Sequence, residues 1–299
     1  MSTYDGFLNF CKPIGWTSHD AVAFVRRRLG QRRVGHAGTL DPLAGGVLPL
    51  CLGRATRLAE RVAAGSKVYA ADLVLGVTTD TCDAEGRVLA VRDPSAIGLD
   101  ALVRALAGLV GPLAQVPPAF SAVKLAGQPA YRRARRGEAL QLAPRPVTVY
   151  GIALLAWAPP RLSIALRCSK GTYVRALARD LGEALGCGAY LAALARLQVG
   201  CFTLADAITP EALERAAAAG HLEAVLLPPD EGCLDLPAIV LDPQEVRYFV
   251  HGRAIPARQA AAPAARAYAH DGRFLGLVRG MGTQWQPMLA LASDDEATS

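Results

Sequence analysis

Short apolar runs alternate with amphipathic stretches along most of this 299-residue chain, and this alternation limits the folds open to it. The runs at 6–11, 47–52 and 147–157 have the length and composition of strands. The stretches at 18–30 and 174–185 have a helical pattern, with capping residues before them and glycine at or just after the end. No unit of about 20–50 residues recurs, which excludes a solenoid or a propeller. We therefore expect a mixed fold of strands and helices.

Length and linker signals predict two domains. A chain of 299 residues exceeds the usual size of one domain, and 228–232 combines prolines, acidic residues and glycine as linkers do. We expect a large domain over 1–230 and a small β-rich domain over 234–293, followed by a disordered tail at 294–299. The stretch 117–146 holds five prolines and the densest basic cluster, so we expect it to be an excursion from the large domain.

Charge and cysteine usage indicate what kind of partner the chain binds and in which cellular compartment it works. The chain has 32 basic and 26 acidic residues, a net charge of +6, which weakly favours a polyanionic partner. Arginine dominates the basic residues and suits phosphate oxygens, but a coding bias explains the total equally well, so only local clusters count. The seven cysteines lack metal-ligand spacing and read as reduced thiols. With no signal peptide and no uncharged run suited to span a membrane, we expect a cytoplasmic protein.

The common signatures of cofactor and hydrolase chemistry are missing from the sequence. It contains no GxxxxGK[ST], no GxGxxG, no HExxH and no GxSxG. Nucleotide hydrolysis by a P-loop, dinucleotide binding and zinc-dependent hydrolysis all lose support.

Two segments carry candidate catalytic residues. Asp41 is the single carboxylate of the glycine-rich segment 35–49, and an apolar strand follows directly. Asp41 is either a catalytic residue or part of an Asp-Pro turn in which its carboxylate is already hydrogen-bonded. Arg175 follows a turn at Lys170-Gly171 and stands early in a helix, where the dipole disfavours a cation. A carboxylate or a phosphate would offset that penalty, and the alternative is a surface arginine.

Two further features are more ambiguous. Tyr69 begins a strand, where a tyrosine is usually a core residue. Tyr131 is followed by four arginines in five residues, with Lys124 upstream and Arg145 nearby, a pattern typical of nucleic-acid contact or of a solvated helix face.

Seven segments, in this order, resemble the bacterial tRNA pseudouridine-55 synthase family. They are KPxGWTS at 12–18, GHAGTLDPLAGGVLP at 35–49, KxY at 67–69, GxxTDTxDxxG at 76–86, PPxFSAxK at 117–124, CSKGTYxR at 168–175 and LGExLGCGA at 181–189. Seven segments in register are highly specific. The last 60 residues before the tail resemble, more loosely, the small PUA-like RNA-binding domain often joined to these enzymes.

The resemblance implies an RNA-modifying isomerase of α+β class. The implied fold is a large mixed, mainly antiparallel sheet flanked by helices and loops, with a small β-barrel-like PUA domain at the C-terminus. Residues 1–230 would form the catalytic domain, in which 117–146 grips RNA, and 234–293 the RNA-binding domain. The implied reaction converts the T-loop uridine of tRNA to pseudouridine by breaking N1–C1′ and forming C5–C1′ after the base has flipped out.

Residue roles also follow from the resemblance. Asp41 would be the nucleophile, Tyr69 would stack on the flipped base and serve in proton transfer, and Arg175 would pair with Asp41. His36 would stack in the displaced T-loop, and Tyr173 would line the pocket with Leu194, which lies outside an exact motif match. The remaining expected substrate contacts are Lys12, Lys124, Lys170, Arg132, Arg133, Arg135 and Arg136.

The reaction is redox-neutral and adds no atoms, so we expect no nucleotide, metal or redox cofactor. We expect tRNA as the partner, no obligate protein partner and a monomer. Three questions stay open. Asp41 could attack C6 of the base or C1′ of the ribose, and the last proton could leave C5 or C2′. The chain could instead be an RNA-binding folding factor, or combine both activities. A synthase acting on another RNA is the third possibility.

Overall fold

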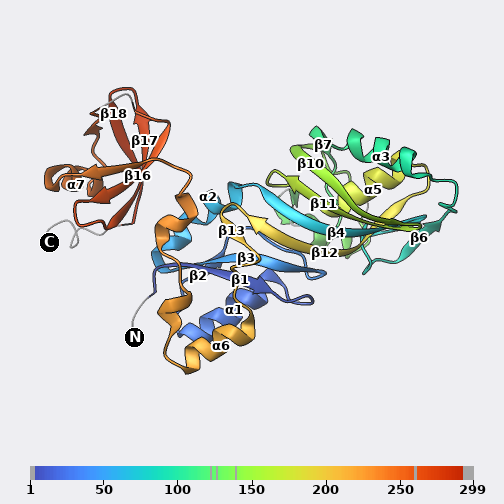
Figure 1. Cartoon of the computed structure of the whole chain (residues 1–299), viewed down its shortest axis with the longest axis horizontal. Helices are drawn as coiled ribbons and strands as arrows, with labels where there is room; N and C mark the ends of the chain where they lie inside the picture. Colours follow the sequence, from blue (N-terminus) through green and yellow to red (C-terminus); the bar gives the residue numbers. More distant parts are fainter. Residues whose placement is uncertain (1–3, 122, 126, 139, 259–260, 292–299) are drawn as a thin grey trace.

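The computed structural model describes residues 4–121, 123–125, 127–138, 140–258 and 261–291. Within these residues the chain forms two main sheets and two small hairpins (Figure 1). The predicted tail at 294–299 lies outside the described residues.

The larger sheet has nine strands in the order β1-β3-β12-β4-β11-β10-β7, with β2 paired to β3 and β13 paired to β12. Among its described pairings only β3 with β12 is parallel, so the predicted mixed, mainly antiparallel sheet is confirmed. Its strands are β1 (Gly6–Lys12), β2 (Val34–His36), β3 (Ala44–Leu52), β4 (Lys67–Leu75), β7 (Gly111–Gln115), β10 (Arg145–Ala158), β11 (Arg161–Cys168), β12 (Ala189–Val199) and β13 (Phe202–Thr203).

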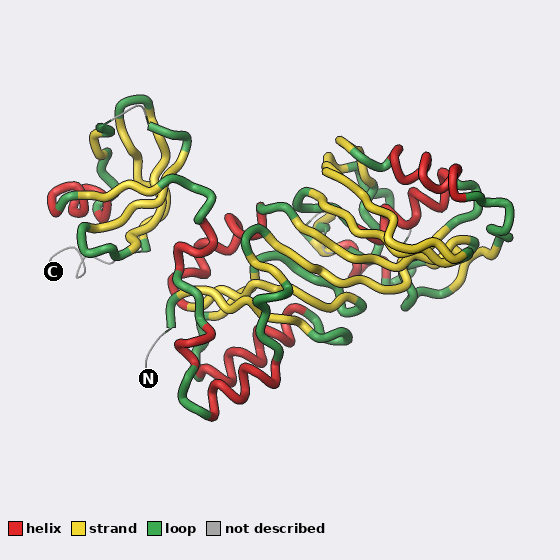
Figure 2. Tube along the Cα trace, in the orientation of Figure 1, coloured by secondary structure: helices red, strands yellow, loops and turns green. Residues whose placement is uncertain are grey.

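Two pairs of helices, α1 with α6 and α3 with α5, lie against this sheet (Figure 2). The helices that precede the C-terminal sheet in the chain are α1 (Ser18–Leu29), α2 (Ala59–Ala64), α3 (Leu99–Gly108), α4 (Ala130–Ala134), α5 (Val174–Ala184) and α6 (Pro210–Ala218), with 3-10 turns at η1 (Gly53–Leu58), η2 (Leu222–Val225) and η3 (Pro229–Cys233). Helices α1 and α6 lie side by side, joined by an ion pair between Arg28 and Glu214. Helices α3 and α5 lie together near β7, β10 and β11.

The first predicted helix shows how local sequence sets an element. Thr17 accepts a hydrogen bond from the amide of Asp20, whose carboxylate accepts in return from the amide of Thr17, a reciprocal cap that fixes the start of α1. Gly30 ends the helix with φ of 59°, in the left-handed region that glycine adopts freely. The predicted helix over 18–30 is therefore confirmed to within one residue.

Two hairpins extend from the large sheet. Strands β5 (Val77–Thr79) and β6 (Val88–Val91) form one, and the short β8 (Lys124–Leu125) and β9 (Gln128–Pro129) form the other. The second hairpin and α4 lie within 117–146, the stretch predicted as an excursion between β7 and β10.

The C-terminal sheet has five strands in the order β14-β16-β17-β18-β15 and forms a separate unit beside the large sheet (Figure 1). Its elements are β14 (Ala238–Leu241), α7 (Pro243–Val250), β15 (Ile255–Pro256), β16 (Ala264–Ala269), β17 (Phe274–Met281) and β18 (Gln284–Ala290). This part of the chain is therefore rich in strands, as expected for 234–293.

The two sheets share an apolar cluster. Phe7 and Leu58 from the large unit pack in one buried group with Leu277 and Leu291 from the C-terminal unit. Arg54 adds a hydrogen bond of 3.0 Å from Nη1 to the carbonyl of Leu291. The contact between the units is therefore apolar at its centre.

Two elements differ from the sequence expectation. Strand β3 starts at Ala44, three residues before the apolar run expected at 47–52, and Gly46 lets it approach the backbone of β12 closely. The central strand β12 and helix α6 were not predicted. Among the described residues, no helix has the length and apolar character needed to cross a membrane.

Candidate active site

Asp41 and Arg175 meet although 134 residues separate them in the sequence. Asp41 lies in the loop between β2 and β3, and Arg175 lies in the first turn of α5. The Nη2 atom of Arg175 is 2.9 Å from Oδ2 of Asp41. The guanidinium is buried, with 7% of the side chain exposed, whereas 38% of the Asp41 side chain is exposed. Of the two partners foreseen for Arg175, the structure supplies the carboxylate.

A second carboxylate, Asp83, also contacts this guanidinium and was not predicted as a site residue. Its Oδ2 atom is 3.3 Å from Nη1 of Arg175, and its side chain is buried. The carbonyls of Thr81 and Phe120 accept further hydrogen bonds from Arg175. The sequence signal for Asp83 was the GxxTDTxDxxG segment, but nothing in that segment tells which distant cation an aspartate meets.

Gln115 fixes the start of α5. Its amide oxygen accepts from the backbone N–H of Tyr173 at 2.8 Å, and its amide nitrogen donates to the carbonyl of Tyr173 at 3.1 Å. Gln115 is buried at the end of β7, so it ties the sheet to the residue that precedes the helix. This arrangement holds Arg175 at a fixed place, and it leaves Tyr173 half-buried beside it.

Tyr69 and Leu194 lie on one face of the sheet next to the Asp41 loop. Leu194 of β12 pairs with Ala71 of β4 and with Ala44 of β3, and Tyr69 lies two residues before Ala71. Since side chains two residues apart on a strand share a face, Tyr69 and Leu194 point the same way. Each is 8% exposed.

Burial raises the pKa of the Tyr69 hydroxyl above its ordinary value of 10.0, although the neighbouring Arg196 cation opposes that shift. The hydroxyl is therefore protonated at neutral pH. This state favours stacking by the ring over proton abstraction by the oxygen.

His36 ends β2, where it pairs with Leu50 of β3. Burial is the main cause that lowers its pKa from 6.5, and the Arg196 cation adds to it. Its Nδ1 atom is buried and has no hydrogen-bond partner among the described residues. The imidazole is therefore neutral at pH 7, which suits a ring that inserts among bases.

Lys12 is buried, unlike a residue that contacts substrate from the protein surface. It has no exposed surface, and its Nζ atom donates to the carbonyls of Pro13 and Trp16 at 2.8 and 2.6 Å. In this conformation the ammonium supports the turn after β1 and does not reach solvent, so the expected contact of Lys12 with substrate has no geometric support. Burial lowers its pKa to about 8.

The four arginines that follow Tyr131 lie on α4 and the turn after it. Arg132, Arg135 and Arg136 are exposed, and Arg135 lies 5.7 Å from the ring centroid of Tyr131. Arg133 instead pairs with Glu138 at 2.6 Å. Three of the four arginines thus remain open to an anionic partner. Lys124 begins β8 in the same stretch.

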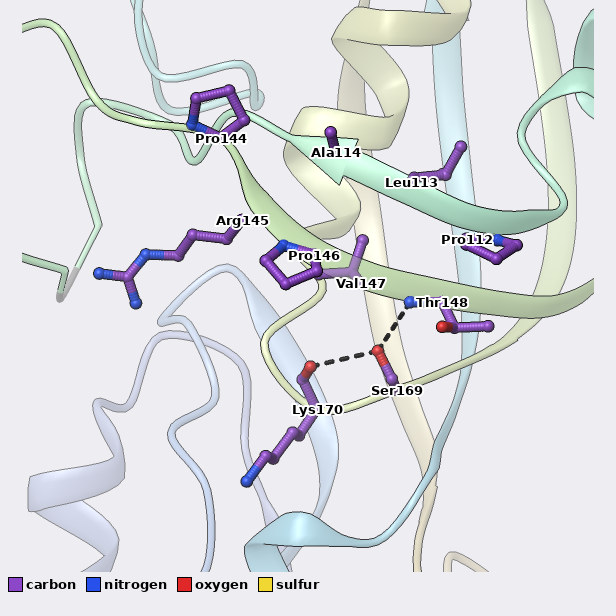
Figure 3. A pocket seen from close by; sticks show the side chains of 10 residues that line it. All are labelled: Pro112, Leu113, Ala114, Pro144, Arg145, Pro146, Val147, Thr148, Ser169 and Lys170. Carbon is purple, nitrogen blue, oxygen red and sulfur yellow. Dashed lines mark hydrogen bonds between the residues drawn. The ribbon is translucent and has the colours of Figure 1, made fainter.

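A cavity of about 650 Å³ lies at the base of this stretch, between β7, β10 and the turn before α5 (Figure 3). Arg145 and Lys170 project from its wall on the same side, and prolines and Leu113 form its apolar part. Ser169 stabilises the turn by accepting from the amide of Thr148 at 2.9 Å. Among the described residues that line this cavity, none is acidic.

The family comparisons agree over nearly the whole chain. Residues 26–174 match the family described as TruB family pseudouridylate synthase (N terminal domain). Residues 175–233 match the tRNA pseudouridylate synthase B C-terminal domain, and 236–292 match tRNA Pseudouridine synthase II, C terminal.

Curated relatives are similar over most of their length. The chain is 45% identical over 278 residues to a tRNA pseudouridine synthase B of Pseudomonas paraeruginosa, which covers 91% of this chain and 90% of the relative. It is 47% identical over 255 residues to a tRNA pseudouridine synthase B of Ralstonia pickettii, which covers 84% of this chain and 80% of that relative.

A solved Cbf5-Nop10-Gar1 complex contains a chain with the same fold, at a TM-score of 0.75 and 24% identity, over 98% of this chain and 86% of that one. These similarities place the protein among the pseudouridine synthases, which are isomerases. It belongs to the TruB family.

Proposed function

We propose that the protein converts a T-loop uridine of tRNA into pseudouridine and that Asp41 is its nucleophile. The tRNA substrate is supported by the names of the curated relatives. The role of Asp41 is carried by one observation: Arg175 holds two carboxylates, and only Asp41 keeps a large exposed fraction. A nucleophile must reach its substrate, and Asp83 is too deeply buried to do so.

The reaction breaks the N1–C1′ bond and forms a C5–C1′ bond. C5 loses its proton and N1 gains one on either route. When the ribose passes through a glycal, C2′ also loses a proton and regains it, so that no atom is added or lost. The Asp41 carboxylate bonds transiently to C6 of the base or to C1′ of the ribose and is released when the new glycosidic bond has formed. Arginine remains charged throughout, so Arg175 can hold the anion in position before and after each step.

The partial exposure of Asp41 limits what Arg175 contributes in the free enzyme. Two unit charges 4 Å apart attract by about 4 kcal/mol at an effective dielectric constant of 20, and contact with solvent weakens that attraction. When RNA covers the site and excludes water, the same contact becomes stronger. The pair therefore orients the nucleophile most firmly when substrate is bound.

Tyr69 and Leu194 supply the walls for the flipped base. Flipping a base costs a few kcal/mol, and stacking on an aromatic ring returns about 1–3 kcal/mol. Tyr173, beside Arg175, closes the pocket from the α5 side. His36 fills the space that the flipped nucleotide leaves in the T-loop.

Cations on two sides hold the RNA backbone. Arg132, Arg135 and Arg136 on the excursion contact phosphates, and Arg145 and Lys170 do so at the cavity below it. Since each neutralised phosphate releases counterions, tRNA binding weakens as salt increases. We further propose that the C-terminal sheet is an RNA-binding domain and that residues 1–230 form the catalytic domain.

The decisive experiment treats unmodified tRNA transcript with the wild-type protein or with Asp41→Asn, in the presence of chelator. Carbodiimide labelling followed by alkali maps pseudouridine as a primer-extension stop. We expect one T-loop stop with the wild type, no stop with Asp41→Asn, and similar tRNA affinity for both.

Two other outcomes would contradict the proposal. Tight binding without a stop by the wild type would indicate an RNA-binding factor, and loss of binding in Asp41→Asn would indicate a structural aspartate. Efficient modification of a tRNA without its T-arm would contradict the proposed substrate.

A further inference from the structure

Arg196 is the most deeply buried arginine near the site, and no part of the proposed chemistry uses it. Only 1% of the residue is exposed, and it is the largest side chain among those that are fully buried. It lies in β12, a strand built from apolar residues on either side. A charge at such a place is costly unless its hydrogen bonds are satisfied.

The guanidinium of Arg196 satisfies its hydrogen bonds on the loop that carries Asp41. Its Nε atom donates to the carbonyl of Val47 at 2.7 Å, Nη1 donates to that of Thr39 at 3.1 Å, and Nη2 donates to that of Gly38 at 3.0 Å. These three carbonyls lie on both sides of Asp41. One side chain therefore joins the incoming and outgoing halves of the loop.

The tip of the loop has a separate support. Ser18 at the start of α1 accepts from the amide of Leu40 at 2.8 Å and donates to its carbonyl at 3.0 Å. The amide of Ala44 donates to the carbonyl of Asp41 at 3.1 Å. Ser18 thus fixes one residue, whereas Arg196 fixes the two ends relative to the sheet.

Arg196 also lies opposite Tyr69. The two residues pair across β12 and β4, and directly opposed residues of antiparallel strands have neighbouring side chains on one face. The Arg196 side chain therefore adjoins both the loop of the proposed nucleophile and the Tyr69 ring that would hold the base.

We infer that Arg196 is a positioning residue that fixes the Asp41 loop and Tyr69 relative to each other, so that its loss slows the chemical step more than it weakens RNA binding. The inference rests on the proposed function for the roles of Asp41 and Tyr69. Lysine cannot replace arginine here, because its single side-chain nitrogen cannot reach all three loop carbonyls, whereas the guanidinium reaches them with three separate nitrogens.

The test compares wild type with Arg196→Lys, which keeps the positive charge and loses the fork. We expect the single-turnover rate constant at saturating tRNA to fall by about 100-fold, the loss that a misplacement of about 1 Å can cause, with an unchanged Kd for tRNA. Hydrogen exchange of the backbone amides in 35–49 should become faster, because the loop has lost its anchor.

Arg61→Lys is the control. Arg61 is also a partly buried arginine with a paired guanidinium, but it belongs to α2 and its partner is the carboxylate of Asp235. This substitution should leave both the rate constant and the exchange of 35–49 unchanged. If Arg196→Lys does not fold, Arg196→Gln takes its place with the same expected results.

Wild-type turnover by Arg196→Lys would overturn the inference, because charge alone would then suffice. Equal losses of rate constant and tRNA affinity, with faster exchange along the whole chain, would overturn it too and make Arg196 an ordinary core residue. Failure of the proposed function is distinguishable, because it would appear as no pseudouridine from wild type and Arg61→Lys, whereas the exchange measurement needs no activity.

Discussion

Asp41 and Asp83 contact different nitrogens of one guanidinium but differ in exposure, with 38% of the Asp41 side chain and 6% of the Asp83 side chain open to solvent. The buried carboxylate supplies a permanent counter-charge to Arg175. The exposed one can leave the guanidinium and return to it without leaving a buried cation unpaired. This division suits a nucleophile that must bond to substrate and be released.

Asp83→Asn should therefore impair the reaction although Asp83 does not reach substrate. We expect the free energy of unfolding to fall by about 1–3 kcal/mol, since a charged hydrogen-bond partner is lost from a buried site. The single-turnover rate constant should fall too, because Arg175 can then shift away from Asp41. Denaturant unfolding and single-turnover kinetics measure the two effects, and the exposed Glu85→Gln in the same loop is the control. An unchanged rate constant would show that Asp41 alone orients Arg175.

Two substitutions at Tyr69 separate the ring from the hydroxyl. Tyr69→Phe should keep most of the rate constant, because burial raises the pKa of the hydroxyl and leaves it a poor base at neutral pH. Tyr69→Leu should lose about 1–3 kcal/mol of stacking on the flipped base. Single-turnover kinetics at saturating tRNA compare them. Equal and complete loss in both variants would instead assign proton transfer to the hydroxyl.

Arg132→Gln combined with Arg136→Gln should weaken tRNA binding and reduce the slope of log affinity against log salt by about 2, one for each lost phosphate contact. Turnover at saturating tRNA should be preserved, because both side chains are exposed and neither is among the partners of Arg175 and Asp41. Filter binding at several salt concentrations measures the slope. The control replaces the exposed Arg87 and Arg104, and equal slopes for the two pairs would make the cluster a solvated face.

Lys12 makes stability depend on pH. Its pKa is about 8 in the folded protein and 10.5 ordinarily, so between these values the unfolded chain binds the proton more tightly. Stability from this group therefore rises with pH across that window. The wild type should gain free energy of unfolding relative to Lys12→Met as pH increases from about 8 to 10.5. Urea unfolding at several pH values checks this, and a constant difference would contradict it. Lys67, whose pKa is also about 8, is present in both proteins and cancels.

Gly46→Ala should destabilise the contact between β3 and β12. Gly46 has φ of 102°, and an added Cβ would lie 2.3 Å from the carbonyl oxygen of Arg196. The strained backbone alone costs about 1–3 kcal/mol, and the close contact adds to it. Thermal unfolding should show a lower Tm than for Gly151→Ala in β10, where an added Cβ meets nothing within 4 Å. Equal Tm values would show that the strands can separate without penalty.

The sequence predicted elements whose signals are local. Thr17 with Asp20 and the terminal Gly30 define α1, and the apolar runs at 6–11, 47–52 and 147–157 predicted β1, β3 and β10 within a few residues. The motif segments also identified Asp41 and Arg175 as a pair, which the structure brings to 2.9 Å. Capping, turns and motif order need only neighbouring residues or a known pattern.

Long-range features could not be predicted in the same way. Strand β12 has the sequence AYLAALARLQV, rich in residues that also suit a helix, and it becomes a strand because β3 and β4 pair with it on both sides. Nothing in that run singled out Arg196, and only the neighbouring loop carbonyls explain its burial. Lys12 was expected at the RNA for similar reasons, since its motif says nothing about which carbonyls surround it.

The apolar cluster of Phe7, Leu58, Leu277 and Leu291, which the two units share, limits how such chains can be divided or recombined. A protein cut after residue 233 would expose the large unit's half of this apolar contact to solvent, so the fragment would aggregate more readily than the intact chain. Grafting the C-terminal unit from a relative would leave gaps or clashes unless the side chains on both sides were exchanged together. The two units therefore have to be divided or recombined as a matched pair, although the segment between them has the composition of a linker.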